Sequence, residues 1–154
     1  MRTTVVPLKK AASADLEEIY ALNITSFSER WSRRSLANAL DMEFDFRIHR
    51  LRGNQLAAYY LGQDVADEVH ILQLAIATPF RRHGLARRIM QQILEEKSKV
   101  GMHRALLEVR ADNRAAQDLY KALGFSLTGR RKAYYKPSGA STQREDALLL
   151  TRNL

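Results

Sequence analysis

The spacing of apolar residues along the chain predicts where strands and helices lie. The run 69–77, VHILQLAIA, is apolar on both faces, which is typical of a buried central strand. From Leu85 to Leu94 the apolar residues recur at a helical period, and charged or amide side chains fill the opposite face. Gly101 follows as the expected end of this helix.

The same alternation continues directly afterwards. Residues 104–110, RALLEVR, predict a second strand, and Asp112 or Asn113 can cap the helix that follows it. Gly124 is placed to end that helix. The order strand, helix, strand, helix over 69–123 predicts two neighbouring parallel strands joined by a right-handed crossover.

The N-terminal half predicts a different arrangement. Residues 3–9 are rich in β-forming side chains and predict a strand, and Ser13 can cap a helix that runs towards Phe27. A short helix is expected over 33–41. Two β-like runs flank the pair at 53–54, Gly-Asn, which predicts a hairpin.

The C-terminal tail predicts two further strands, near 125–134 and 145–152, separated by the polar segment KPSGASTQR. Glycine and proline are sparse, at 7 and 3, and no linker or repeat interrupts the pattern. We therefore expect residues 1–154 to form one α/β domain, a sandwich with a mixed central sheet.

Composition excludes several classes of protein. The chain has no cysteine, which rules out a disulfide scaffold, a cysteine nucleophile and a thiolate metal site. Its four histidines show no ligand spacing, so no metal is expected. No apolar run has membrane length and the first residues lack the apolar core of a signal, so the expected compartment is the cytoplasm, with no membrane partner.

The formal net charge is +8. Such a charge fits a nucleic-acid partner, a phosphate-rich cofactor or simply a well-solvated basic surface. No recognised RNA-binding signature appears in the sequence, and we expect no DNA partner. The sequence does not indicate the oligomeric state.

The first candidate site lies between the central strand and the long helix, in the segment Arg81-Arg82-His83-Gly84-Leu85-Ala86. The first N–H groups of a helix have no partners within the helix and favour an anion. Gly84 permits close backbone approach, and the arginines add positive charge. The segment therefore predicts a site for pyrophosphate, the alternative being a basic helix start with a glycine in its turn. It matches neither the P-loop nor the dinucleotide fingerprint.

The second candidate site is Glu108, a carboxylate within an otherwise apolar strand. It is either a general base or a surface residue that pairs with Arg110 on the same strand face. Tyr120 is a further candidate site residue because of its expected position relative to Glu108. Three strand residues outward and seven helical residues back each cover about 10 Å, which brings the two level with each other. The alternative for Tyr120 is a core aromatic.

At these residues the chain resembles a known family. The segment Arg81-x-x-Gly84-x-Ala86 is similar to the acetyl-CoA signature of the GCN5-related N-acetyltransferases, abbreviated GNAT. The run LEVRADNRAAQDLYKALGF, the segment GRRKAYYKP and the closing EDALLL resemble the ribosomal-protein-alanine N-acetyltransferases of the RimI type. The resemblance covers about the whole chain and is densest over 69–137, while Phe27 and Trp31 fit it more loosely.

The resemblance implies a GNAT-like fold, in which the strand that ends at Ile76 parts from its neighbour and leaves the sheet partly splayed. It implies acetyl-CoA as cosubstrate and no metal. The backbone of the strand end and the loop after it would hold the cosubstrate, with Asn113 on its pantetheine arm. The implied cofactor-binding residues are Leu74, Ala75, Ile76, Arg81, Arg82, His83, Gly84, Leu85, Ala86, Arg87 and Asn113.

The resemblance also assigns catalytic roles. Glu108 matches the general base that takes a proton from the acceptor amine, directly or through water, and Tyr120 matches the general acid that protonates the departing CoA thiolate. A backbone N–H near Ile76 would stabilise the oxyanion. Tyr134 and Tyr135 would line the acceptor side, with ordinary strand packing as the alternative for one of them.

The acceptor implied by the resemblance is the N-terminal alanine of a small-subunit ribosomal protein. A lysine side chain or a small-molecule amine is the alternative acceptor, and a non-catalytic CoA- or RNA-binding domain is a further alternative. Glu108 suits an α-amine as acceptor. The α-amino group has a pKa of about 8, so an appreciable fraction is neutral near pH 7.4, whereas only about one lysine side chain in a thousand is neutral there.

Overall fold

The structure, a computed structural model, describes residues 5–154 and contains one mixed sheet of seven strands. The strands follow the order β1-β2-β3-β4-β5-β7-β6. Their bounds are Lys9–Lys10 for β1, Asp45–Leu51 for β2, Gln55–Val65 for β3, Glu68–Ile76 for β4, Arg104–Arg110 for β5, Ser126–Tyr135 for β6 and Glu145–Asn153 for β7. All neighbouring pairs are antiparallel except β4 and β5.

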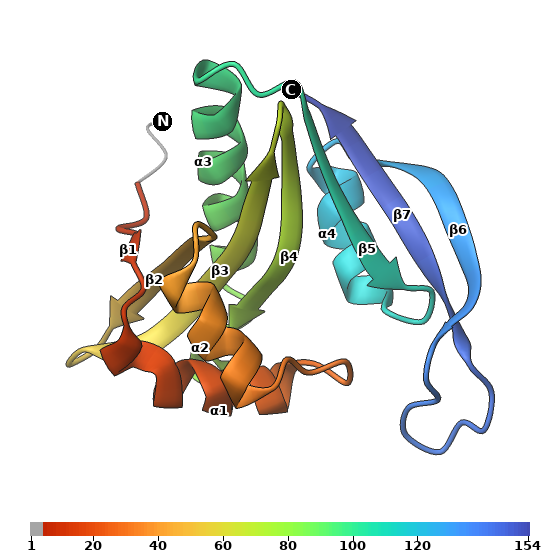
Figure 1. The fold of residues 1–154 in the computed structure, drawn as a ribbon, viewed down its shortest axis with the longest axis horizontal. Helices are drawn as coiled ribbons and strands as arrows, with labels where there is room; N and C mark the ends of the chain where they lie inside the picture. The colour runs from red at the N-terminus through yellow and green to blue at the C-terminus, as the bar shows by residue number, and fades with distance from the viewer. Residues whose placement is uncertain (1–4) are drawn as a thin grey trace.

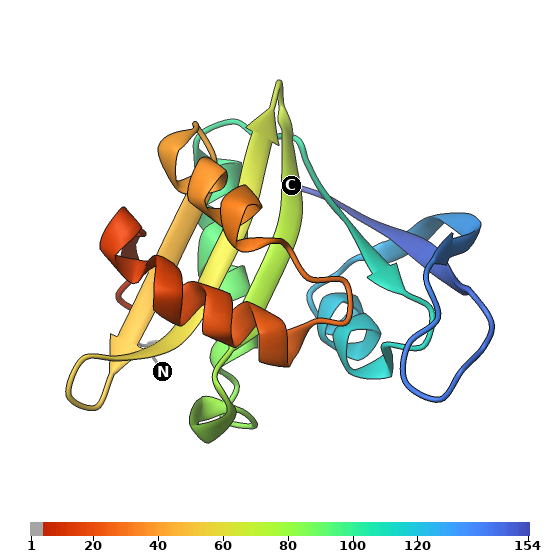
Figure 2. The same ribbon diagram turned by 60° about the horizontal axis from the view of Figure 1, so that its bottom comes forward.

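Helices cover the sheet on both sides (Figures 1 and 2). Their bounds are Leu16–Ser26 for α1, Arg33–Asp41 for α2, Leu85–Lys99 for α3 and Arg114–Ala122 for α4. Helices α1 and α2 lie on one face of β2–β4, α3 lies on the other face, and α4 packs behind β5 (Figure 1). Among the described residues, no helix is both long and apolar enough to cross a membrane.

Two apolar cores hold these layers together, one on each face of the sheet. Ile19 and Leu36 of α1 and α2 pack on Ile48 and Leu61 of the strands. On the other face the buried residues of α3 share a core with those of β4, β5 and α4. The second core therefore joins the N-terminal and C-terminal halves of the chain behind the sheet.

The predicted pair of parallel strands is present, with α3 as the crossover between β4 and β5. The ladder between them is short: Glu68, Val69 and His70 pair with Arg104, Ala105 and Leu106, and no later residues pair. Beyond this point the two strands diverge (Figure 1). The sheet is thus splayed where the resemblance implied.

Most predicted elements are confirmed, and two N-terminal expectations are wrong. Over residues 5–10 the expected first strand is reduced to Lys9–Lys10, while residues 3 and 4 lie outside the described part. Ser13 does not cap α1. Instead, Asp15 accepts a hydrogen bond at 2.8 Å from the backbone N–H of Ala12 and thereby fixes the turn into the helix.

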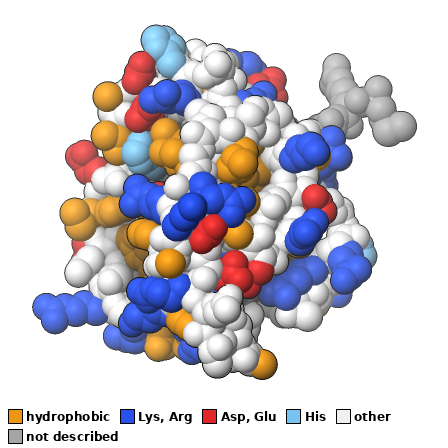
Figure 3. All heavy atoms as spheres, turned by 90° about the vertical axis from the view of Figure 1, so that its right-hand side faces the viewer, with side chains coloured by type: hydrophobic (Ala, Val, Ile, Leu, Met, Phe, Trp, Pro, Cys, Tyr) orange, Lys and Arg blue, Asp and Glu red, His pale blue; other side chains and the backbone are white. Residues whose placement is uncertain are grey.

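The two edges of the sheet differ from its interior. Strand β1 is two residues long. Strand β6 is exposed along most of its length and its pairing with β7 is interrupted twice, between Leu127 and Gly129 and between Arg131 and Tyr135. Lysine and arginine side chains gather on the face of the molecule that carries this edge (Figure 3).

Candidate active site

A cavity of about 820 Å³ lies where β4 and β5 diverge. Its size falls in the range of small-molecule sites, about 300–1,000 Å³. Its walls come from β4, the loop before α3, β5, α4, the end of β6 and the connection between α1 and α2. Residues far apart in the sequence therefore meet in one site.

One end of the cavity is formed by a continuous stretch of chain, from β4 into α3. Leu74, Ala75 and Ile76 line it, and Arg81 donates a hydrogen bond at 2.8 Å from Nε to the carbonyl oxygen of Ile76. This bond ties the loop to the end of the strand. We call this part, residues 74–87, the cosubstrate end.

The loop reaches α3 through two residues with left-handed backbone, Arg82 at φ 64° and Gly84 at φ 74°. A Cβ atom on Gly84 would meet no atom of the described residues within 4 Å, so the strain of positive φ rather than crowding favours glycine here. The predicted loop residues that line the cavity are Arg81, Arg82, Gly84, Leu85, Ala86 and Arg87; His83 does not. Free N–H groups at a helix start and several guanidinium groups fit a pyrophosphate.

Strand β4 contains a bulge that the sequence did not predict. Leu61 pairs with Gln73 and Gly62 with Ile71, so Leu72 has no partner on β3. Leu72 is 38% exposed and lines the cavity. The bulge re-aims the strand just before the cosubstrate end. An unbroken apolar run such as VHILQLAIA gives no signal for it.

Glu108 lies on β5, lines the cavity and has a half-buried side chain, 27% exposed. Its expected alternative partner was Arg110, and this expectation is wrong. Arg131 of β6 pairs with Glu108, with 3.1 Å between Nη2 and Oε1, while the Arg110 guanidinium is occupied by Glu29 and Asp112. Arg131 reaches across β7 because β6 and β5 both pair with that strand.

Tyr120 of α4 also lines the cavity and is 7% exposed. It packs edge-on against Phe125, with 5.4 Å between the ring centroids. Burial raises the pKa of the Tyr120 hydroxyl well above its usual value, so the hydroxyl carries its proton at neutral pH. Tyr120 is thus a packed aromatic that also faces the cavity, as Glu108 does.

Asn113 is the N-cap of α4, as predicted, because its Oδ1 accepts a hydrogen bond at 3.1 Å from the N–H of Ala116. It also lines the cavity. Capping fixes the orientation of its side chain at the cavity wall. Asn113 therefore presents a held amide group, which suits contact with an extended polar ligand.

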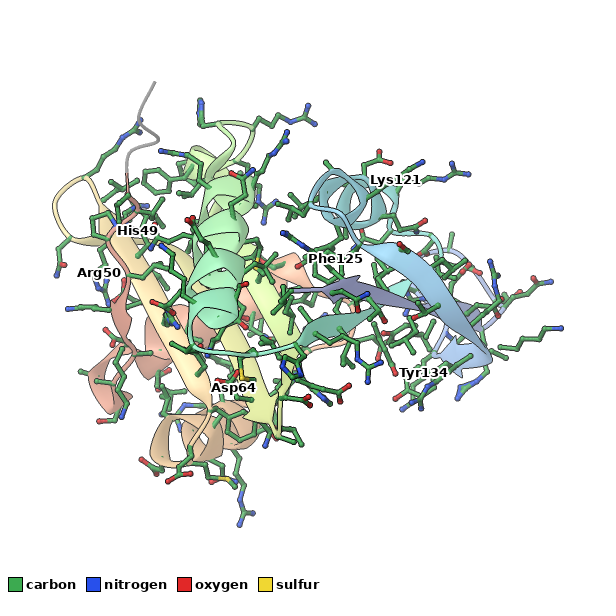
Figure 4. The ribbon with its side chains drawn as sticks, turned by 90° about the horizontal axis from the view of Figure 1, so that it is seen from above. His49, Arg50, Asp64, Lys121, Phe125 and Tyr134 are labelled. Carbon is green, nitrogen blue, oxygen red and sulfur yellow. The ribbon has the colours of Figure 1, made fainter. Side chains whose placement is uncertain are left out.

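Tyr134 and Tyr135 line the opposite end of the cavity from α3, which we call the acceptor end. Their rings meet edge-on at 5.0 Å, and the guanidinium groups of Arg131 and Arg110 lie over them at 5.2 and 5.0 Å. Burial, with nearby negative charge, raises the pKa of Tyr135 to about 12. Tyr134 extends from the β6 side of the molecule (Figure 4).

The acceptor end contains residues that sequence reasoning missed. The last residue of α1, Ser26, and the connection to α2 with Ser28 and Glu29 line it, as does Gln73 of β4. His70 lines the cavity at the end of the β4–β5 ladder. Phe27 and Trp31, which had a loose resemblance to support them, also line the cavity. These positions are spread over two segments without a local motif. Their meeting depends on the tertiary fold.

Gln73 belongs to a buried polar network beside the cavity. Its Oε1 accepts hydrogen bonds from Asn23 Nδ2 at 2.8 Å and from the Tyr59 hydroxyl at 2.8 Å. Asn23 also donates to the Tyr59 oxygen at 2.9 Å. The network ties α1 to β3 and β4, so the helix that leads into the acceptor end is fixed to the sheet.

The family model for the acetyltransferase (GNAT) family matches residues 16–125. The chain belongs to this family. It is 30% identical over 139 residues to a [Ribosomal protein bS18]-alanine N-acetyltransferase of Escherichia coli strain K12, with 90% of each chain covered. It is 34% identical to the enzyme of the same name from Salmonella typhimurium, covering 90% of this chain and 91% of that one.

A solved structure supports the same assignment. The ribosomal-protein-S18-alanine N-acetyltransferase from Escherichia coli superposes with a TM-score of 0.85 at 27% identity, covering 96% of this chain and 92% of that chain. The predicted family, the fold and the enzyme class, an N-acetyltransferase with acetyl-CoA as cosubstrate, are confirmed. The roles of individual site residues stay predictions.

Proposed function

We propose that this acetyltransferase modifies the α-amine of the N-terminal alanine of ribosomal protein bS18. The observation that carries the proposal is the 30% identity to the Escherichia coli enzyme of that name across 90% of both chains. The position of Glu108 and Tyr120 on the walls of one cavity supports the chemistry. The cosubstrate supplies the acetyl group as a thioester.

In the proposed mechanism the acceptor nitrogen attacks the thioester carbon directly, so that an N–C bond forms and the C–S bond breaks. Glu108 accepts the proton that the amine loses, directly or through a water molecule. A general base of this kind contributes about 10²–10⁴-fold to the rate. Tyr120 donates its proton to the leaving sulfur. Its hydroxyl is suited to this role because burial raises its pKa and keeps it protonated.

In the same proposal the cosubstrate end acts through its backbone. Leu74, Ala75 and Ile76 hold the pantetheine arm, and a backbone N–H near Ile76 stabilises the oxyanion. The loop over 81–87 binds the pyrophosphate through the N–H groups at the start of α3. Asn113 contacts the arm from the other wall of the cavity.

The acceptor chemistry favours an α-amine. Its pKa of about 8 leaves a usable neutral fraction near pH 7.4, whereas about one lysine in a thousand is neutral. A carboxylate base in a cavity open to the surface is therefore sufficient for an N-terminus. Tyr134 and Tyr135 would contact the first residues of the acceptor.

The test is acetyl transfer measured in two ways at once, as free-thiol release from acetyl-CoA and as the intact mass of the product. One acceptor is a peptide with the alanine-initiated N-terminus of bS18, and its control is the same peptide with the α-amine blocked. We expect a gain of one acetyl group on the free peptide alone. Modification of the blocked peptide would assign the activity to lysine instead.

If both peptides remain unmodified while CoA binds, the acceptor proposal is wrong and a screen of small-molecule amines follows. If CoA binds without thiol release from any amine, a non-catalytic domain is the better description. RNA binding with a steep dependence on salt concentration would be the signature of that alternative.

A further inference from the structure

Arg110, the last residue of β5, contacts two segments that border the acceptor end, the connection between α1 and α2 and the segment around the end of β6. Its Nη1 donates at 2.8 Å to Glu29 Oε1 in the connection between α1 and α2. Its Nη2 donates to the carbonyl oxygen of Lys136 at 3.1 Å and lies 3.3 Å from Ser138 Oγ, both in the segment between β6 and β7. The same guanidinium group lies over the ring of Tyr135.

These contacts matter because the two halves of the sheet are poorly connected beyond the short β4–β5 ladder. We call the end at which β4 and β5 are paired the closed end, and the end at which they diverge the open end. At the closed end, Arg104 pairs with Glu68 and His103 pairs with Asp67. At the open end, within the part of the chain that the structure describes, the ion pair between Arg110 and Glu29 is the one that joins the two halves. The cavity lies between these two sets of contacts.

The two partners differ in how firmly they are held. The Arg110 side chain is 10% exposed and keeps several acceptors on its own half of the molecule. The Glu29 side chain is 41% exposed. The pair can therefore open by movement of the Glu29 segment while Arg110 stays in place. An exposed partner makes the contact a reversible one rather than part of the core.

We propose that Arg110 is a positioning residue for the acceptor, acting as a latch with Glu29 that sets the distance between the two segments bordering the acceptor end. This deepens the proposed function and rests on it for the identity of the acceptor. The cosubstrate end lies on other elements, the end of β4 and the start of α3. The latch therefore affects acceptor binding and leaves cosubstrate binding unchanged.

The kinetic test compares Glu29→Ala and Arg110→Gln with the wild type. Each variant should raise the KM for the alanine peptide about tenfold, the effect of losing one charge-assisted hydrogen bond, while the KM for acetyl-CoA changes less than about twofold. The double variant should have the same KM for the peptide as Arg110→Gln alone, because the two residues act through one shared ion pair. If Glu29→Ala still raises the KM for the peptide tenfold in the Arg110→Gln background, Glu29 contacts the acceptor itself and the latch is refuted.

Two matched controls use ion pairs of the same type elsewhere. Glu17→Gln removes a pair between Glu17 and Arg33 within the N-terminal half, and Glu68→Gln removes the pair with Arg104 at the closed end. Neither glutamate lines the cavity. Both controls should keep the wild-type KM for the peptide. A tenfold rise in either would show that any surface pair has this effect and would overturn the proposal.

A distance measurement tests the latch without an acceptor. Because the chain has no cysteine, spin labels can be placed at Arg30→Cys and Thr142→Cys, exposed positions on the two segments, without background labelling. Glu29→Ala should broaden the distance distribution, and Glu17→Gln should not. An unchanged distribution refutes the latch, even if the peptide is acetylated. Conversely, broadening with no peptide acetylation supports the latch and refutes the proposed acceptor.

Discussion

The two ends of the cavity are built in different ways. The cosubstrate end comes from one continuous stretch, residues 74–87, which runs from a strand end through a loop to a helix start and is tied together by the bond from Arg81 to Ile76. The acceptor end is assembled from side chains of distant segments, with Arg110 in contact with both Glu29 and Tyr135. One end therefore depends on residues that are neighbours in the sequence, and the other depends on the tertiary fold.

This difference predicts that substitutions at the two ends change different kinetic constants. A change at the cosubstrate end should alter CoA affinity, and a change at the acceptor end should alter acceptor binding. Between the ends, Glu108 and Tyr120 should affect turnover alone. The predictions below test this division, beginning with the largest expected effect.

Replacing Glu108 by glutamine should lower kcat by about a hundredfold, because the amide cannot accept the amine proton. CoA affinity should stay near the wild-type value, since Glu108 lies outside residues 74–87. Steady-state kinetics and calorimetric CoA titration measure the two quantities. Glu95→Gln on the exposed face of α3 is the matched control and should behave as wild type. Wild-type turnover by Glu108→Gln would remove Glu108 from the mechanism.

Replacing Tyr120 by phenylalanine should lower kcat by about tenfold with the domain still folded, because the ring packing on Phe125 is kept while the proton donor is lost. Tyr60→Phe is the matched control. Within residues 5–154 the buried Tyr60 hydroxyl has no hydrogen-bond partner, and Tyr60 does not line the cavity. This control should keep full turnover. Equal rates for all three proteins would leave Tyr120 as a packing residue.

Replacing Gly84 by alanine should weaken CoA binding by roughly fivefold, because a shifted helix start misplaces the N–H groups that face the anion. It should also cost about 1 kcal/mol in unfolding free energy, since φ is 74° there. Gly53, in the hairpin turn, has φ 69° and equally open surroundings. Gly53→Ala should therefore show the stability loss without the change in CoA affinity, and a shared affinity loss would contradict the assignment of the loop.

The last prediction has no effect at neutral pH and concerns stability at high pH. Burial raises the pKa of Tyr59, Tyr60 and Tyr120 in the folded state, whereas the unfolded chain releases these protons near pH 10. Their contribution is fully present below about pH 10 and is lost as the pH rises further, by up to about 1.4 kcal/mol per pH unit for each group. Urea unfolding between pH 8 and 11 measures this, and Tyr60→Phe should flatten the decline. An equal slope in the variant would contradict the prediction.

Local signals in the sequence were sufficient for much of the fold. Helix α2 has the predicted bounds of 33–41, strand β5 has the predicted bounds of 104–110, and Asn113 caps α4 as expected. These features depend on residues within a few positions of one another. The strand, the glycine turn and the helix start over residues 74–87 could be predicted for the same reason, because they follow directly in the chain.

Features that depend on contacts between distant parts of the chain could not be predicted from the sequence. The bulge at Leu72 arises from pairing with β3, and no residue within the run marks it. Arg110 stands two positions from Glu108 on one strand, yet its partner is 81 residues away. Ser13 has the right chemistry for a cap, but Asp15 binds the N–H of Ala12 instead and is itself held by Arg50, 35 residues away. In each case, packing in three dimensions chose between locally equivalent options.

The edges of the sheet have a consequence for self-association. A long, flat, apolar edge offers unpaired backbone groups to other chains and promotes aggregation. Here β1 is two lysines long, and β6 carries two interruptions and the exposed basic residues Arg130, Arg131 and Lys132. Charge repulsion and irregular backbone at both margins oppose strand exchange between copies. The protein can thus keep a sheet open at its centre for ligands without offering its margins to a second sheet.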